Sequence, residues 1–305
     1  GPLAVGMIEG SRAGADSLMT FLVYAAFILA VIPLISVIWT VLANGIPGLT
    51  SNMLFTSMNG VTGFHDNQAD APSQVMGGAY HAIIGTVSIT FWATLMSVPV
   101  GLLTAIYLVE YSRGGWFSKA ITFFVDVMTG IPSIVAGLFA IGLFTLIFGP
   151  KFQAGIVGAI ALSVLMIPVV VRSCEEMLKL VPNELREASL ALGVPKWLTI
   201  VKVVLPTAVA GIATGVTLAI ARIIGETAPL LVTAGLSTSL NPNMFKDPMA
   251  TLPVFAYYQI TQPGVDKQPY IDRAWSAVLV LIIIVMVLNV LARLISKFFA
   301  PKTGR

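Results

Sequence analysis

The sequence predicts an all-α integral membrane protein with six transmembrane helices, and both composition and hydropathy indicate this fold class. Of its 305 residues, 57% are hydrophobic and only 10% are charged. Because soluble domains carry roughly 25% charged residues, a soluble globular protein is excluded, and the apolar content also excludes a disordered chain. The single cysteine, Cys174, excludes a disulfide framework, and with only two histidines we expect no metal site. The net charge of +3 gives no indication of nucleic acid binding.

Six segments have the length and hydropathy of membrane spans, since a helix needs about 20 mostly apolar residues to cross the hydrocarbon. Glycine and proline inside them are compatible with spanning helices, because neighbouring helices satisfy the freed backbone groups. The six predicted spans are residues 17–43, 81–109, 120–148, 154–171, 206–234 and 274–291.

These spans divide the chain into a membrane core flanked by shorter regions. Because the chain starts with Gly1-Pro2 rather than methionine, we expect its first residues to be processed or engineered. The predicted regions are an N-terminal cytoplasmic tail (1–16), a first transmembrane helix (17–43), an extracytoplasmic loop (44–80), a core of five transmembrane helices (81–292) and a cytoplasmic C-terminal tail (293–305). Within the core lie a cytoplasmic loop at 173–205 and an extracytoplasmic loop at 235–273.

The distribution of lysine and arginine predicts the orientation, because cytoplasmic segments of membrane proteins carry an excess of both. With the N-terminus in the cytoplasm, only Lys151, Lys246, Lys267 and Arg273 fall outside, and Arg222 lies within a span. The remaining lysines and arginines fall inside. We therefore expect both termini to be cytoplasmic.

The cytoplasmic loop is the most informative stretch of the sequence. A helix of about eleven residues is predicted at 182–192, where Leu185, Ala188 and Leu192 form one apolar stripe. Gly193 is a typical residue to end such a helix. The physical pattern alone allows an ordinary amphipathic loop helix or a docking element for a cytoplasmic partner.

The spacing in this loop resembles the EAA signature of ABC importer permeases. That signature is Glu-Ala-Ala, three residues, Gly, nine residues, then Ile-x-Leu-Pro, and here Ser189 and Val203 are conservative departures from it. The matching positions are Glu187, Ala188, Ser189, Gly193, Leu205 and Pro206. The resemblance implies the architecture of a type I importer permease, in which these residues form a coupling helix that seats on an ATP-hydrolysing subunit.

The energy source is expected in another subunit. The chain contains no Gly-Lys dipeptide and hence no GxxxxGK[ST] phosphate-binding loop. We therefore expect a transport subunit that is not an enzyme and holds no cofactor of its own. By resemblance, ATP and Mg would be bound by the partner ATPase.

Two charged residues, Arg222 and Glu226, fall in the middle of the fifth predicted span, four residues apart and so on one helix face. A charge at the bilayer centre costs about 2.5 to 3.5 kcal/mol on insertion scales and usually faces the bundle interior. The pair could simply neutralise itself and hold helices together. Alternatively, the arginine contacts an anion in transit, because its planar guanidinium suits phosphate.

The surrounding sequence favours the transport interpretation. Residues 221–231 (ARIIGETAPLL) and 129–139 (TGIPSIVAGLF) resemble the A-type permease subunit of phosphate-specific (Pst) ABC importers. The resemblance extends over the second to sixth spans. It implies a substrate path for inorganic phosphate formed by Arg222, Glu226 and Thr227, in a bacterial cytoplasmic (inner) membrane. The implied partners are a homologous second permease, two ATP-hydrolysing subunits and an extracytoplasmic phosphate-binding protein.

Three alternatives remain open at this stage. The same machine could carry another oxyanion or solute, which the coupling signature alone does not separate from phosphate. An intramembrane enzyme could use Glu226 or Asp126, although no second catalytic aspartate or serine–histidine pair is evident within the spans. A passive channel would have no need of a coupling loop.

Overall fold

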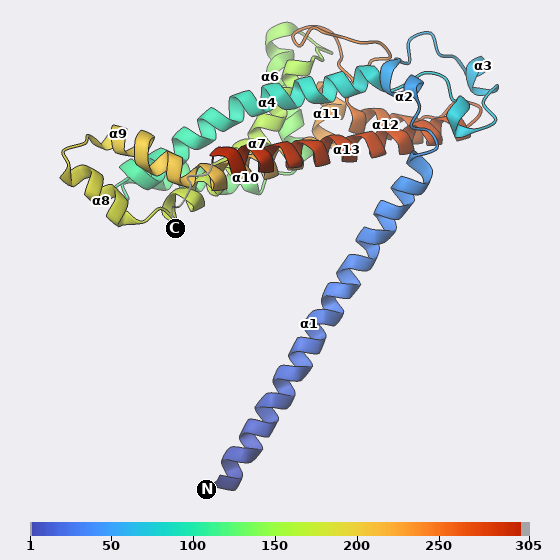
Figure 1. The fold of residues 1–305 in the computed structure, drawn as a ribbon. Coiled ribbons are helices and arrows are strands. Elements are labelled where there is room, and N and C mark those ends of the chain that lie inside the picture. The colour runs from blue at the N-terminus through green and yellow to red at the C-terminus, as the bar shows by residue number, and fades with distance from the viewer. Residues whose placement is uncertain (1, 300–305) are drawn as a thin grey trace.

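The chain folds as an elongated bundle of helices from which one long helix projects (Figure 1). The structure, a computed structural model, describes residues 2–299, with side chains for residues 14–294 and 297. This part of the chain contains helices and loops and no strand. Its long helices are α1 (Pro2–Gly45), α4 (Tyr80–Ile106), α7 (Gly155–Lys179), α10 (Leu205–Ile223) and α13 (Gln268–Phe299).

Shorter elements connect the long helices. On the extracytoplasmic side of the predicted topology lie α2 (Ser51–Phe55), α3 (Gly63–Asp66), the 3-10 turn η1 (Pro72–Gln74) and α12 (Leu252–Thr261). The opposite end carries the π-helical turn η2 (Tyr107–Tyr111), α8 (Asn183–Ala191), α9 (Lys196–Thr199) and the π-helical turn η3 (Ile200–Val204). Figure 1 shows these two groups at opposite ends of the bundle.

The third predicted span, 120–148, is not one helix. It is divided into α5 (Trp116–Thr129) and α6 (Ser133–Phe148), which are bent by 107° at the intervening residues. Pro132 has no N–H to continue the helix and disfavours helical geometry at Ile131, so the chain turns there. Among the described residues, five helices are long and apolar enough to cross a membrane, or up to six when this bent pair counts as one span. The prediction of a single helix was wrong, but the order of spans is confirmed.

The fifth predicted span, 206–234, is also interrupted. Helix α10 ends at Ile223, and a second short helix, α11, runs over Ala228–Thr233. Pro229 occupies the first turn of α11, where its missing N–H costs nothing. Residues 224–227 therefore form a non-helical break rather than the middle of a continuous span.

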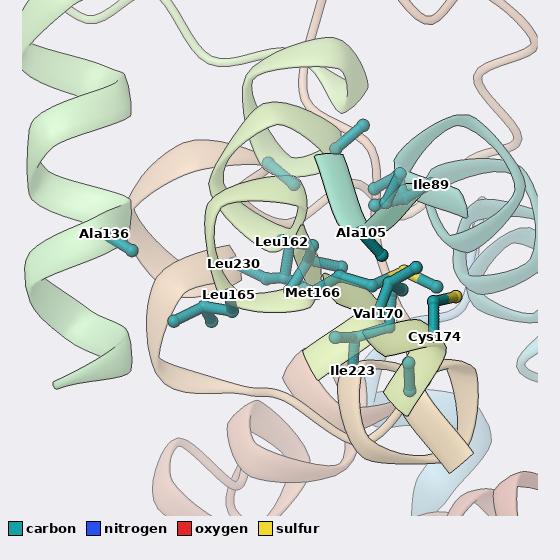
Figure 2. Close-up of a cluster of buried hydrophobic side chains, with 14 of the residues drawn as sticks. Ile89, Ala105, Ala136, Leu162, Leu165, Met166, Val170, Cys174, Ile223 and Leu230 are labelled. Atoms are coloured by element: carbon teal, nitrogen blue, oxygen red, sulfur yellow. The ribbon is translucent and has the colours of Figure 1, made fainter. Parts of the chain in front are cut away.

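Helix α7 is the centre of the bundle. In its most apolar window 72% of residues are buried, against 22% for the helices that contain α4 and α10. Figure 2 shows Leu162, Met166 and Val170 of α7 among side chains from α4, α10 and α11. Small residues permit this close packing. A Cβ on Gly101 of α4 would lie 2.6 Å from a methyl of Val170 and would clash with it, so glycine lets α4 approach α7 closely.

Helix α1 joins the bundle only at its C-terminal end. Ser276 of α13 donates a 3.2 Å hydrogen bond to the carbonyl of Gly45, and a Cβ on Gly45 would lie 2.9 Å from Leu279. Along the rest of α1 the described side chains are exposed, and Figure 1 shows the helix pointing away from the other spans. Such an apolar helix is covered by lipid or by another chain in a membrane.

Candidate substrate path and coupling surface

The coupling loop folds as its sequence predicts. Pro182 is the N-cap of α8, and the helix ends before Gly193, whose φ of +80° suits a residue without a side chain. Lys196 then begins a helical stretch that continues without interruption through η3 into α10. The arm of the loop that follows the Gly193 turn is therefore continuous with a membrane-spanning helix.

The apolar stripe of α8 faces solvent rather than the bundle. Leu185 is 41% exposed and Leu192 is 83% exposed, and Trp197 beyond the turn is 60% exposed. Of the residues of the signature, Glu187, Ala188, Gly193 and Pro206 are exposed as well, while Leu205 is half-buried. An exposed apolar surface on a projecting helix is typical of a protein interaction site.

Ser189, where the EAA signature has alanine, is buried and hydrogen-bonded. Its hydroxyl lies 2.9 Å from the hydroxyl of Thr199 in α9. This bond crosses the turn formed by Gly193 and Pro195 and joins the two arms of the loop. The departure from the signature therefore has a structural counterpart within the same loop.

Arg186 fixes α8 to the end of another span. Its Nη2 donates a 2.7 Å bond to Oε1 of Glu110 in η2, and its Nε donates to the same oxygen at 3.0 Å. The same guanidinium donates to the carbonyls of Leu178 and Val181, at 2.8 and 2.6 Å. These charge-assisted bonds are shielded, because the two charged side chains are only 15% and 6% exposed. Thus α8 is held against the turn that continues α4, as well as against α7.

The predicted substrate-path residues gather at the break between α10 and α11. Arg222 is the penultimate residue of α10 and is exposed, whereas Glu226 and Thr227 lie beyond the helix and are half-buried. The backbone N–H of Glu226 donates to the carbonyl of Ile223 at 3.1 Å, and Thr227 is the N-cap of α11. The three residues are thus close in sequence but belong to two separate helices and their connection.

The expectation that Arg222 and Glu226 share one helix face is wrong, because the helix ends between them. The structure also shows no ion pair between them, and the Arg222 side chain forms no hydrogen bond with any described residue. A mutual neutralising pair within this chain is therefore not supported. Arg222 is instead a charge available to a partner from outside the chain.

Arg222 belongs to a stripe of α10 that faces away from the rest of its own chain. Thr207, Thr214 and Leu218 precede it at helical spacing and are exposed, whereas Thr217 and Ala219 are buried, as is Gly215, which lies seven residues before Arg222 at the edge of the stripe. At this edge of the stripe α10 packs on α7, since a Cβ on Gly215 would lie 2.5 Å from Ser173. The exposed stripe carries hydroxyl groups and one guanidinium in a span that is otherwise apolar.

The comparisons with known proteins agree with this arrangement. Residues 97–305 match the family described as binding-protein-dependent transport system inner membrane component. The chain is 45% identical over 290 residues to phosphate transport system permease protein PstA 1 of Mycobacterium tuberculosis (strain H37Rv), covering 95% of this chain and 90% of that protein. It is 40% identical to the PstA protein of Yersinia pestis, covering 88% of this chain and 84% of that one. The chain belongs to the PstA permease family.

Solved structures support the same architecture for this PstA-family chain. The inward-facing MetNI methionine ABC transporter has a chain that matches with a TM-score of 0.57 and 19% identity, over 72% of this chain and 95% of that one. A bacterial alginate ABC transporter in complex with its periplasmic protein matches with a TM-score of 0.58 and 15% identity, over 93% and 96%. These likenesses establish the type I ABC importer permease fold, with the family's role as a transport component rather than an enzyme.

Several important contacts of this PstA-family chain were not predicted from sequence. Neither Arg186 nor Glu110 was identified as a coupling residue, although an isolated carboxylate at the end of the second span is an unusual feature. Asp126 of α5 pairs with Arg172 of α7. Arg172 also binds Glu175 at 2.8 Å. Asp126 thus joins α5 to α7 through an ion pair.

Arg273 is the second unexpected residue. It was counted with the outside loop, but it lies in α13 and is 1% exposed. It pairs with buried Asp66 of α3 and donates a 3.1 Å bond to the carbonyl of Met76. This contact fixes the 44–80 loop, which carries no sequence signature, onto the bundle. Among the described residues no group of His, Cys, Asp and Glu is arranged to hold a metal ion.

Proposed function

We propose that this PstA-family chain imports inorganic phosphate by alternating access, together with a homologous second permease, and that phosphate passes between the two along the exposed stripe of α10. The observation that carries the proposal is Arg222, an exposed guanidinium with no partner among the described side chains. An arginine in a membrane span is costly in lipid and requires water or a polar partner. A water-filled path between two permeases supplies such a surrounding.

The chemistry of the stripe fits an oxyanion. Arginine forms paired, charge-assisted hydrogen bonds with phosphate oxygens. The hydroxyls of Thr207 and Thr214 donate to the carbonyls of Val203 and Ala210 in their own helix, so they make the stripe more polar and leave Arg222 as its charged donor. Glu226 and Thr227 lie at the break just beyond Arg222. We assign Glu226 the role of limiting the dwell time of a fully ionised anion near Arg222, since like charges repel. Thr227 offers a hydroxyl on the same path.

The driving force comes from two ATP-hydrolysing subunits that bind ATP and Mg on the cytoplasmic side. We propose that their cleft receives the exposed apolar face of α8, formed by Leu185, Leu192 and the neighbouring Trp197. Closure of that cleft would tilt α8, and the Arg186–Glu110 contact would pass the movement to α4 while Gly193 keeps the angle to α9. Both termini would then be cytoplasmic, and an extracytoplasmic binding protein would deliver phosphate at the opposite end.

The second candidate is the same transporter with another oxyanion as substrate. Guanidinium and hydroxyl groups bind sulfate as well as phosphate, so the stripe of α10 does not separate them by itself. The relatives that match this chain over most of their length are named phosphate transport system permease proteins, and this favours phosphate.

The decisive experiment measures uptake by the assembled transporter in proteoliposomes with its binding protein and ATP. Arg222→Gln is expected to lower phosphate uptake at least about tenfold, because it removes one charge-assisted contact in a poorly solvated path, while Arg222→Lys retains part of it. Thr217→Ser on the buried side of α10 serves as the matched control. Normal uptake by assembled Arg222→Gln transporter would refute the proposed path, and equal competition by sulfate would refute phosphate as the specific substrate.

A further inference from the structure

A cavity of about 230 Å³ lies at the extracytoplasmic end of the bundle, away from Arg222 and the stripe of α10. It is an open pocket lined by the 44–80 loop, the start of α4, the segment that follows α11, and helices α12 and α13. At about 30 Å³ per liquid water, this volume accommodates a small polyatomic ion with several waters. None of its eleven lining residues is Asp, Glu, Lys or Arg.

His81, in the first turn of α4, is the polar group that needs explanation. It is only 2% exposed and it lines the cavity, but neither ring nitrogen makes a hydrogen bond with the described residues. The ring is positioned by an edge-to-face contact with Phe255, at 5.5 Å between centroids, and by the backbone of Ser237, which is the one polar group among the described residues near enough to pair with a ring nitrogen. Even with the Ser237 backbone beside one ring nitrogen, the other nitrogen of the buried imidazole has no partner among the described residues, and a ligand in the cavity would satisfy it.

A second buried side chain is oriented by a chain of contacts behind the cavity wall. Gln259 is 8% exposed, and its carbonyl oxygen accepts a 3.5 Å bond from Nη1 of Arg273, which leaves its NH₂ group to donate elsewhere. Arg273 is itself held by Asp66. Tyr270, which also lines the cavity, has its ring 5.0 Å from the Arg273 guanidinium. One wall of the cavity is thus backed by the buried Arg273–Asp66 ion pair, which holds Gln259 and Tyr270 in place.

We propose that this cavity binds inorganic phosphate in a protonated form, as an extracytoplasmic station before the α10 path. The proposal rests on phosphate being the substrate. Protonated phosphate offers both O–H donors and oxygen acceptors, and neutral imidazole, amide and hydroxyl groups likewise donate and accept. Sulfate only accepts at neutral pH, so it cannot satisfy the acceptor nitrogen of His81. The lack of carboxylates among the lining residues avoids repulsion of the anion.

The test uses the assembled transporter in nanodiscs, without ATP and without binding protein, in the Arg222→Gln background so that the α10 path contributes little. Binding of radiolabelled inorganic phosphate is measured by equilibrium dialysis. We expect saturable binding that arsenate displaces and sulfate does not, and we expect His81→Phe to weaken it at least about tenfold, the equivalent of one or two hydrogen bonds. Met58→Leu, which changes an apolar residue of the same cavity, should leave affinity within about twofold.

Other outcomes overturn the proposal. The proposal is contradicted if assembled His81→Phe transporter binds phosphate as tightly as the transporter that retains His81. It is also contradicted if sulfate displaces phosphate as well as arsenate does, or if His81→Phe impairs docking of the binding protein while phosphate binding is unchanged. If His81→Phe fails to assemble, Gln262→Leu removes another polar group of the cavity, and unchanged affinity in that variant would contradict the site. A transporter that imports phosphate but shows no His81-dependent binding refutes only the station, whereas one that imports no phosphate refutes the proposed function.

Discussion

At the scale of single residues, the contacts that were hardest to predict are the ion pairs between distant segments. Arg186 and Glu110 are 76 positions apart, and Arg273 and Asp66 are 207 positions apart. A sequence shows that such residues are charged and where spans end, but the choice of partner depends on tertiary packing. The positions of the coupling signature were predictable because their spacing is local, and Arg222 was identifiable because a charge in an apolar span is conspicuous.

The Arg186–Glu110 contact yields the first prediction. Arg186→Glu places two carboxylates together, and we expect phosphate uptake to fall at least about tenfold while ATP hydrolysis falls less, because α8 still docks but no longer moves α4. Losing one partner of a shielded ion pair is destabilising by about 3 to 5 kcal/mol when it is fully buried, and by less here. The ratio of phosphate transported to ATP hydrolysed, measured in proteoliposomes, reports the effect.

The control for this prediction is the double reversal, Arg186→Glu with Glu110→Arg. It restores opposite charges and should recover part of the ratio, although the carbonyls of Leu178 and Val181 lose their donor. A double variant no better coupled than Arg186→Glu alone would show that the pair plays no part in transmitting movement.

The turn after α8 yields a second prediction at the same scale. Gly193 has a φ of +80°, which asparagine adopts far more readily than a β-branched residue. We expect Gly193→Val to reduce assembly with the ATPase or ATP-driven uptake, and Gly193→Asn to retain most of both. Co-purification of the ATPase and uptake measured on the same preparations separate the two variants, and equal behaviour would contradict a role for this backbone angle.

At the scale of elements, proline explains both what was predicted and what was not. Pro99 and Pro168 lie inside α4 and α7, which remain helices, whereas Pro132 begins α6 after a 107° bend. The residues before the proline differ: α5 ends with Gly130 as its C-cap, two residues before Pro132. Gly225 likewise lies between the end of α10 and Pro229 of α11. Hydropathy averages over such signals, so it predicts the membrane segment but not the break within it.

Helix packing yields the third prediction. A Cβ on Gly85 of α4 would lie 1.9 Å from the carbonyl oxygen of Ala250, whereas a Cβ on Gly142 of α6 would meet nothing within 4 Å. We expect Gly85→Ala to lower the thermal stability of the purified transporter, at a cost of about 1 to 3 kcal/mol or more, because backbone has to move. Gly142→Ala should be neutral or slightly stabilising, since alanine favours the helix. Equal melting temperatures for the two variants would contradict this packing.

At the scale of the whole molecule, the chain has two exposed surfaces that another subunit would cover in a complete transporter. The exposed stripe of α10 presents Arg222 and two threonines away from the chain, and α8 presents exposed leucines at one end of the bundle. Composition predicted a membrane protein and the loop predicted a coupling partner, but no sequence pattern predicted that α1 would leave the bundle or that Arg222 would be unpaired. Both features depend on which surfaces another subunit covers.

The central claim is that phosphate passes along the exposed stripe of α10, and thiol accessibility tests it most directly. Thr214→Cys and Thr217→Cys are introduced separately with Cys174→Ala, and the assembled transporter is treated with a charged, water-soluble methanethiosulfonate reagent. We predict rapid labelling at position 214, slowed by phosphate, and little labelling at buried position 217. Equal labelling of the two positions, or labelling of 214 that phosphate leaves unchanged, would contradict the account.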